Sequence, residues 1–329
     1  MISRGAGRAL AGVLLAAAAV VAACGGGPAS GTSQVSFPTV VTLGGCEVCP
    51  QINNQSLAVG DNRVSIGLTD RQDNQVLDAR VHLRFYDLSG RAPVFLSEAE
   101  AQFVPITLAY VDSQNANRET TSGASGVYVA HATFTKAGDW GVQISITRGG
   151  KALKPIPYRF TVLEHSSEPE VGEPAPPSQQ QTVATAPNIE AIDSSYPPRT
   201  AMHEITVADA LKTGKPIVLA FATPAFCTSR TCAPVMDTVM DPLYAAYHDQ
   251  AIFIHIEPYD LGPLRQSNIE EPVRATREWR LQSEPWIFVI GRDRRIAAKF
   301  EGPTAKGEVE AVLREVLAAP LPGTPPAGH

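Results

Sequence analysis

The chain has 329 residues, of which 18% are charged and 44% are hydrophobic, and its formal net charge is −6. Its Lys and Arg residues are spread along the chain without runs, so there is no basic stripe to neutralise phosphates, and we expect no nucleic-acid partner. A chain of this length, less a leader and linkers, favours two domains rather than one.

The N-terminus has the pattern of a secretory signal. Arg4 and Arg8 precede an apolar stretch, Leu10 to Ala23, that is shorter than the ~20 apolar residues of a membrane span. The four residues that end at Cys24 resemble the lipobox of bacterial lipoproteins. The resemblance implies a signal peptide over 1–23, lipidation of Cys24 and a protein anchored on the extracytoplasmic face of the cell membrane. A cleaved, soluble secreted protein is the alternative.

Residues 24–52 are expected to form a tether, because the stretch after Cys24 is rich in Gly, Ser and Pro. The tether contains a C-x-x-C motif, Cys46 and Cys49. Pro50 stands where the c-type haem attachment motif has His, so haem attachment is excluded. A small structural disulfide and a second redox centre that relays electrons to a distant cysteine pair remain as the two interpretations.

Residues 53–165 alternate apolar and polar side chains with period two, and turn signals separate the runs. This pattern predicts an all-β immunoglobulin-like sandwich domain. The alternating apolar positions are Val64, Ile66 and Leu68, then Val81, Leu83 and Phe85, then Val127 and Val129, then Val142, Ile144 and Ile146.

Two short motifs in this region, residues 125–128 (SGVY) and 137–140 (AGDW), resemble strand signatures of FixH-like or YtkA-like extracytoplasmic domains. The histidines of this region, His82, His131 and His165, have no metal-ligand spacing. We therefore expect them to be solvent-facing or hydrogen-bonded rather than metal ligands.

Residues 166–188 are rich in Pro, Glu, Gln and Ser, with almost no large apolar side chain. Such a composition cannot bury a core and predicts an extended linker between two independently folding domains. Residues 321–329 are expected to form a disordered tail.

Residues 189–320 alternate strand and helix signals in the order β-α-β-α-β-β-α. The first strand is a continuous apolar run, as in a parallel strand that is buried on both faces. The expected elements are strands at 217–222, 252–256, 286–290 and 295–300, the last two joined by a tight turn, with helical stripes at 235–247, around 273–279 and at 309–317.

This order of elements resembles the thioredoxin superfamily, with Cys227 and Cys232 after the first core strand and Ser283-Glu284-Pro285 before a later one. The resemblance implies an α/β thioredoxin-like domain. It also implies a cis-proline at Pro285 that borders a substrate groove together with Phe226 and Trp286.

The C-x4-C spacing restricts how the pair can close. Residues five apart on a regular helix face away from each other, whereas a disulfide needs Cα atoms within about 7 Å. Pro234 favours a helix that begins near Cys232, which leaves residues 227–231 as a loop; otherwise the first turn unwinds on oxidation. We expect Cys227 to be the nucleophile, Cys232 the resolving thiol and Arg230 a cation that stabilises the thiolate.

The chain differs from three known groups of cysteine-containing proteins at residues on which their chemistry depends. Q-type peroxiredoxins have a threonine three residues before the nucleophile, where this chain has Pro224, and Sco-type copper chaperones need a later histidine that is missing between His255 and the C-terminal residue. Thioredoxins bury an acidic residue below the cysteines, but residues 218–221 contain none, so His255 or Glu257 is expected to move protons instead.

The sequence therefore favours a membrane-anchored thiol-disulfide oxidoreductase that acts on protein thiols and disulfides outside the cytoplasm, without cofactor or metal. The alternative is a binding module in which a static Cys227–Cys232 bridge and the β-sandwich together hold a protein partner or a metal ion.

Overall fold

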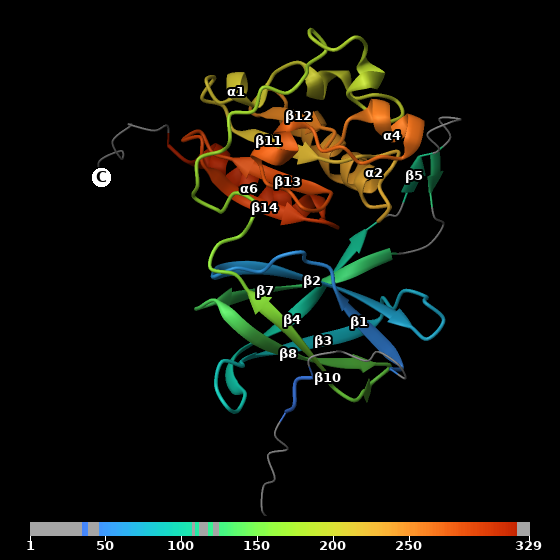
Figure 1. Cartoon of the computed structure of the whole chain (residues 1–329), viewed down its shortest axis with the longest axis vertical. Coiled ribbons are helices and arrows are strands. Elements are labelled where there is room, and N and C mark those ends of the chain that lie inside the picture. The colour runs from blue at the N-terminus through green and yellow to red at the C-terminus, as the bar shows by residue number, and fades with distance from the viewer. Residues whose placement is uncertain (1–34, 39–45, 107–108, 112–117, 121–124, 321–329) are drawn as a thin grey trace, which may run out of the picture. The chain divides into compact units, whose positions relative to one another are not determined.

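The computed structural model describes residues 35–38, 46–106, 109–111, 118–120 and 125–320 (Figure 1). Most of its regular structure is β. The first part of the chain forms one large sheet and a separate two-stranded ribbon, β5 and β6. The strands are β1 (Val48–Ile52), β2 (Gly60–Asp70), β3 (Ala79–Asp87), β4 (Val94–Ile106), β5 (Ala109–Val111), β6 (Arg118–Thr120), β7 (Ser125–Phe134), β8 (Gly138–Arg148), β9 (Lys151–Ala152) and β10 (Ile156–Val162).

The large sheet has eight strands in the order β1-β2-β7-β4-β3-β8-β10, with β9 added beside β8. Strand β4 is 13 residues long and joins the two halves of the sheet. Its first part, Val94 to Ala101, pairs with β3, and its last part, Gln102 to Ile106, pairs with β7. Strand β4 therefore joins the two halves into one continuous sheet, and they do not form the two separate sheets of a sandwich.

The concave core of the large sheet is almost wholly apolar. Alternate side chains of β2, β3, β7 and β8 point into it, as period two requires. Phe134 is fully buried and its ring contacts Phe85, Trp140 and Phe160. The alternating apolar runs of the sequence are thus confirmed as strands.

The second part of the chain forms a four-stranded sheet with short helices. Figure 1 shows its strands among α1, α2, α4 and α6. The elements are η1 (Ile189–Ala191), η2 (Thr200–His203), α1 (Val207–Ala210), β11 (Ile217–Phe221), α2 (Cys232–Val235), η3 (Met236–Met240, a π-helix), α3 (Asp241–Tyr247), β12 (Ile252–Ile256), α4 (Leu261–Ser267), α5 (Arg274–Glu278), β13 (Trp286–Ile290), β14 (Ile296–Glu301) and α6 (Lys306–Ala318).

The four strands lie in the order β12-β11-β13-β14. Strand β11 pairs in parallel with β12 and antiparallel with β13, and all five of its residues are buried. Val218 and Ala220 face the helices that follow Cys232, whereas Leu219 and Phe221 face Trp279 and the opposite core. The predicted strands and the predicted hairpin of this part are confirmed.

The predicted fold class, an α/β thioredoxin-like domain plus a separate all-β immunoglobulin-like sandwich, is wrong. The structure is 37% strand and 20% helix, with a curled half-barrel sheet, a second small sheet and no clear α/β thioredoxin core. Period two places alternate side chains inward both in one curled sheet and in two stacked sheets, so it does not distinguish them. The helical stripe at 235–247 is divided among α2, the π-turn η3 and α3, which leaves short helices.

The segment 166–188, expected to be an extended linker, is packed. Ser178 is fully buried, its hydroxyl donates to Glu278, and it accepts a hydrogen bond from the Trp279 indole at 3.2 Å. The backbone N–H of Ala175 donates to the Arg294 carbonyl at 2.9 Å. Backbone and small polar side chains make these contacts, so the lack of large apolar residues did not prevent docking.

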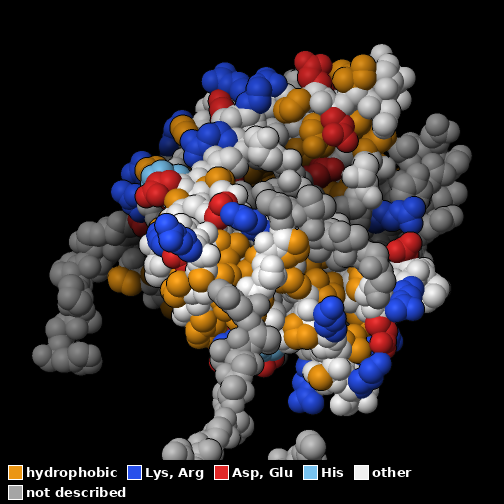
Figure 2. Space-filling model, turned by 60° about the horizontal axis from the view of Figure 1, so that its bottom comes forward, with side chains coloured by type: hydrophobic (Ala, Val, Ile, Leu, Met, Phe, Trp, Pro, Cys, Tyr) orange, Lys and Arg blue, Asp and Glu red, His pale blue; other side chains and the backbone are white. Residues whose placement is uncertain are grey.

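Cys24 and the tail 321–329 lie outside the described residues. Within the part of the chain that the structure describes, every helix is too short or too polar to span a bilayer. Figure 2 shows one face of the molecule, on which Lys and Arg side chains lie among Asp and Glu side chains and not in a stripe of their own.

Candidate functional site

The cysteine loop lies between β11 and α2. The buried strand ends at Phe221, and the Thr223 carbonyl then accepts backbone N–H bonds from Phe226 at 3.2 Å and Cys227 at 3.0 Å. Helix α2 begins at Cys232, which confirms that the residues after Cys227 form a loop and not a helical turn. This loop lets two cysteines five positions apart in sequence approach each other.

Cys227 has the environment of a stabilised thiolate. Its Sγ lies 3.4 Å from the backbone N–H of Cys232 and 3.1 Å from the Ser229 hydroxyl. The hydrogen bond from the Cys232 thiol, with further bonds from Ser229 and from backbone N–H groups, lowers the pKa of Cys227 to about 6 although burial opposes this. The residue is buried, with 7% of its surface exposed, and it borders a cavity.

Cys232 is the opposite case. It is fully buried, and burial together with the neighbouring Cys227 raises the pKa of its thiol above the ordinary value. Both cysteines are free. The pair therefore consists of one sulfur whose thiolate form is stabilised and one fully buried sulfur whose protonated form is favoured.

Glu284 is a third member of this site that the sequence did not reveal. One carboxylate oxygen of Glu284 and the two cysteine sulfurs lie within 4.8 Å of one another. Burial raises the pKa of Glu284 to about 9, and the charge of Cys227 adds to the rise, so the carboxyl is protonated at neutral pH. The available signal was its position directly before Pro285, whose peptide bond is cis as expected.

A cavity of about 600 Å³ opens beside Cys227. Phe226 and Arg230 line it, together with residues 264–268 at the end of α4. Trp286, predicted to border the substrate groove, is instead 4% exposed, donates its indole N–H to the Ser283 hydroxyl at 3.0 Å and lines a different cavity. The space next to Cys227 is therefore bordered by the cysteine loop and α4.

Arg230 lines this cavity but is not among the largest influences on the Cys227 thiol, which are hydrogen bonds and burial. Its backbone has a positive φ of 58°, and its N–H donates to the Cys227 carbonyl at 3.1 Å. The largest stabilising influence on the Cys227 thiolate is the hydrogen bond from the Cys232 thiol, followed by Ser229 and backbone N–H groups, and the role of the Arg230 cation stays a prediction.

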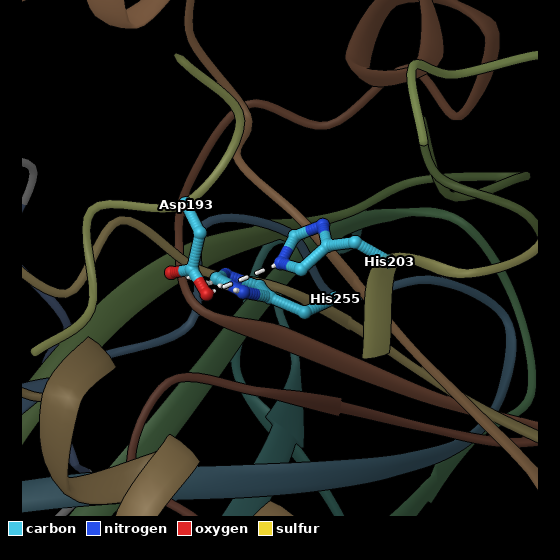
Figure 3. Close-up of side chains that lie close together, drawn as sticks. All are labelled: Asp193, His203 and His255. Atoms are coloured by element: carbon cyan, nitrogen blue, oxygen red, sulfur yellow. Dashed lines mark ion pairs between the residues drawn. The ribbon is translucent and has the colours of Figure 1, made fainter. Parts of the chain in front are cut away.

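A second polar cluster, Asp193, His203 and His255, is buried in the same half of the chain (Figure 3). His255 lies on β12, His203 ends η2, and Asp193 follows η1. Asp193 Oδ2 is 3.3 Å from His203 Nε2, and Asp193 Oδ1 is 3.6 Å from His255 Nδ1. The sequence singled out His255 alone, since Asp193 and His203 lie in segments without a long periodic pattern.

Burial lowers the pKa of His255 to about 4, so its ring is neutral at neutral pH. Nearby Glu257 is also buried, and burial raises its pKa to about 8; its Oε1 accepts the Ser194 N–H at 2.7 Å. Neither residue belongs to the group formed by Cys227, Cys232 and Glu284. Glu284, which does belong to this group, is therefore better placed than His255 or Glu257 to move protons at the cysteines.

Cys46 and Cys49 form a disulfide, with a Cα–Cα distance of 5.5 Å, at the start of β1. Cys49 pairs with Thr69 on β2, so the disulfide lies on β1, the strand at the edge of the large sheet. Among the described residues, His82, His131 and His165 belong to no group that could hold a metal ion.

No protein-family model matches the chain, and no curated protein matches it. Among solved structures, the chain is similar to a DUF4426 family protein from Pseudomonas aeruginosa PAO1, with 11% sequence identity and a TM-score of 0.23. The similarity covers 36% of this chain and 91% of the other, and at this TM-score it carries no argument. The comparisons give no support to the thioredoxin or FixH-like resemblances, and the function has to be inferred from the residues of this chain.

Proposed function

We propose that the protein is an extracytoplasmic, lipid-anchored thiol-disulfide oxidoreductase that exchanges disulfides through Cys227 and Cys232. One observation carries the proposal: two neighbouring free thiols have opposite environments, one stabilised as a thiolate and one buried and protonated. A nucleophile and a resolving thiol need this difference.

In the proposed disulfide exchange, Glu284 carries the protons. The Cys227 thiolate attacks one sulfur of a substrate disulfide, that S–S bond breaks, and protonated Glu284 gives its proton to the leaving thiolate. The Glu284 carboxylate then takes the Cys232 proton, and Cys232 attacks Cys227 to release the second substrate thiolate. The protein dithiol is oxidised and the substrate disulfide is reduced; the reverse sequence oxidises a substrate dithiol.

The location of the protein is part of this proposal. The apolar run before Cys24 supports lipidation of that residue, and the Cys46–Cys49 disulfide supports an oxidising compartment. A diacylated cysteine holds a protein on a membrane stably.

Trapping experiments test the redox role. Reduced Cys232→Ser protein mixed with glutathione disulfide should accumulate a mixed disulfide at Cys227, measured by mass spectrometry, whereas Cys227→Ser should accumulate none. Glu284→Gln should slow the first attack, because the leaving thiolate loses its proton donor, and should slow the resolution step at least ~10-fold, because the Cys232 proton loses its acceptor. Equal trapping at both cysteines, or no reaction of either reduced thiol, would overturn the proposal.

A second candidate is metal binding by Cys227, Cys232 and Glu284, because one atom of each lies within 4.8 Å of the others. A static bridge in a binding module is the related alternative. The reduction potential of the Cys227–Cys232 pair distinguishes a static bridge from an exchanging pair. A structural disulfide has a potential below about −300 mV, whereas an exchangeable one has a higher potential. Titration of the reduced protein with Zn²⁺, in parallel with Glu284→Gln, detects the metal site.

A further inference from the structure

The ring of His255 has a fixed orientation. Its Nε2 lies 2.9 Å from the Ala222 carbonyl oxygen, which only accepts hydrogen bonds, so Nε2 carries the proton. In a neutral ring, Nδ1 then presents a lone pair. That lone pair faces Asp193 Oδ1 at 3.6 Å, and Nδ1 has no hydrogen-bond partner.

The Asp193 carboxyl group accepts two backbone N–H bonds. Its Oδ1 accepts the Ser195 N–H at 2.7 Å, and its Oδ2 accepts the Arg199 N–H at 2.6 Å. The Arg199 guanidinium does not neutralise it, since that group forms ion pairs with Asp237 and Asp241. The carboxylate is therefore fixed in place and faces an acceptor nitrogen in a fully buried setting.

His203 supplies a second imidazole nitrogen to the same point. Its Nε2 is 3.3 Å from Asp193 Oδ2, is 98% buried with its side chain and makes no hydrogen bond. The two rings lie edge to face with centroids 5.0 Å apart (Figure 3). Buried polar atoms without partners are costly, so their convergence indicates that a cation belongs between them.

We propose that Asp193, His203 and His255 bind a divalent transition-metal ion of the Zn²⁺ class. Zn²⁺ bonds of about 2.0–2.2 Å at tetrahedral angles place two ligand atoms about 3.4 Å apart. The separations from His203 Nε2 to Asp193 Oδ2 and from His255 Nδ1 to Asp193 Oδ1, 3.3 Å and 3.6 Å, are close to this value, and one ligand atom of each residue lies within 4.8 Å of the others. Two imidazoles and one carboxylate disfavour Ca²⁺ and Mg²⁺, which prefer oxygen ligands.

Two of the three residues border a cavity. His203 and His255 line this cavity of about 350 Å³, which Glu257 also borders. Glu257 Oε2 is buried without a hydrogen-bond partner, so it is placed to form a hydrogen bond with a water or small ligand bound at the site. This metal site is separate from the thiol pair and does not depend on the proposed redox activity.

The test uses the full-length chain in a Cys227→Ser/Cys232→Ser background, which removes thiol ligands. Isothermal titration should show one Zn²⁺ per chain, and Co²⁺ should give visible d–d bands without a sulfur-to-cobalt charge-transfer band. Asp193→Asn and His203→Gln should each weaken Zn²⁺ binding by about 100-fold or more. The matched control is His248→Gln, a partly exposed histidine outside the cluster.

Unchanged Zn²⁺ affinity in Asp193→Asn and His203→Gln would overturn the proposal, as would a loss of binding in His248→Gln. Absence of both Zn²⁺ binding and Co²⁺ bands in the folded parent protein would show that a proton alone joins the three residues, and this outcome also overturns it. Because the Co²⁺ spectrum of the parent needs no substitution in the cluster, a variant that fails to fold does not obscure the result.

Discussion

The cores of the two sheet regions differ in chemistry. In the large sheet, the buried polar side chains are two serines, Ser65 and Ser125, and the rest of the core is apolar. In the small-sheet region, buried titratable groups include Asp193, His203 and Glu257. Burying such groups costs stability. The apolar core of the large sheet thus contributes stability, whereas the small-sheet region loses part of its own stability by burying these titratable groups.

The largest effect should come from the apolar core of the large sheet. Phe134→Ala removes a fully buried ring and should lower the free energy of unfolding by about 3–5 kcal/mol, measured by urea denaturation. Val94→Ala, at a half-exposed position of β4, should change it by less than about 0.5 kcal/mol. If Phe134→Ala also changed Cys227 alkylation in native buffer, the two regions would not be separable in function.

The Cys46–Cys49 disulfide should contribute less. A loop of four residues corresponds to about 2 kcal/mol in the chain-entropy model, so Cys46→Ala/Cys49→Ala should lose roughly that amount in thermal or urea unfolding. Trapping at Cys227 should be unaffected. Slower turnover with an intact mixed-disulfide step would instead point to electron relay between the two cysteine pairs.

The small-sheet region should give the protein a pH-dependent stability. Burial raises the pKa of Glu257 to about 8 and of Glu284 to about 9, so above about pH 4.5 each of these two carboxyls binds more protons in the folded state than in the unfolded state. Each should lower stability between pH 5 and 8 by about 1 kcal/mol per pH unit, and this effect levels off above pH 9. The lowered pKa values of His255, about 4, and of Cys227, about 6, act in the opposite direction and offset part of the fall.

Glu284→Gln should remove its share of this slope in urea denaturation at several pH values. Glu98→Gln, at an exposed position of the large sheet, should leave the slope unchanged. A slope that is the same in Glu284→Gln as in the parent protein would mean that this carboxyl is ionised in the folded protein.

The smallest effect concerns the thiolate. The alkylation rate of Cys227 should rise with a midpoint near pH 6. Ser229→Ala should raise that midpoint by up to about 1 pH unit, because the 3.1 Å contact with the thiolate is lost. Arg230→Ala should raise the midpoint less than Ser229→Ala does. A larger shift in Arg230→Ala would support the predicted role of the arginine cation in stabilising the thiolate.

Local sequence patterns predicted individual elements better than their assembly. The apolar run of β11 and the β13–β14 hairpin follow from side chains that are near in sequence. The continuity of the large sheet depends on both ends of β4, which pair with different strands, and no periodicity records this.

For the candidate sites too, the sequence predicted residues that lie near one another in the chain and missed residues that come together only in the fold. Cys227 and Cys232 share one loop and were found, whereas Asp193, His203 and His255 meet only after folding. Glu284 was missed because the acidic partner was sought on β11 and not before Pro285. Tertiary contacts, which the sequence pattern does not show, bring these groups together.

The packing of residues 166–188 decides where this protein can be divided. A fragment that starts at residue 189 lacks Ser178, which satisfies the buried Trp279 indole N–H, and lacks the backbone that pairs with Arg294. Such a fragment would expose the flank of its own core and be prone to aggregation. Expression of the small-sheet region alone should therefore begin at or before Ser166, so that the segment 166–188 is retained with the core against which it packs.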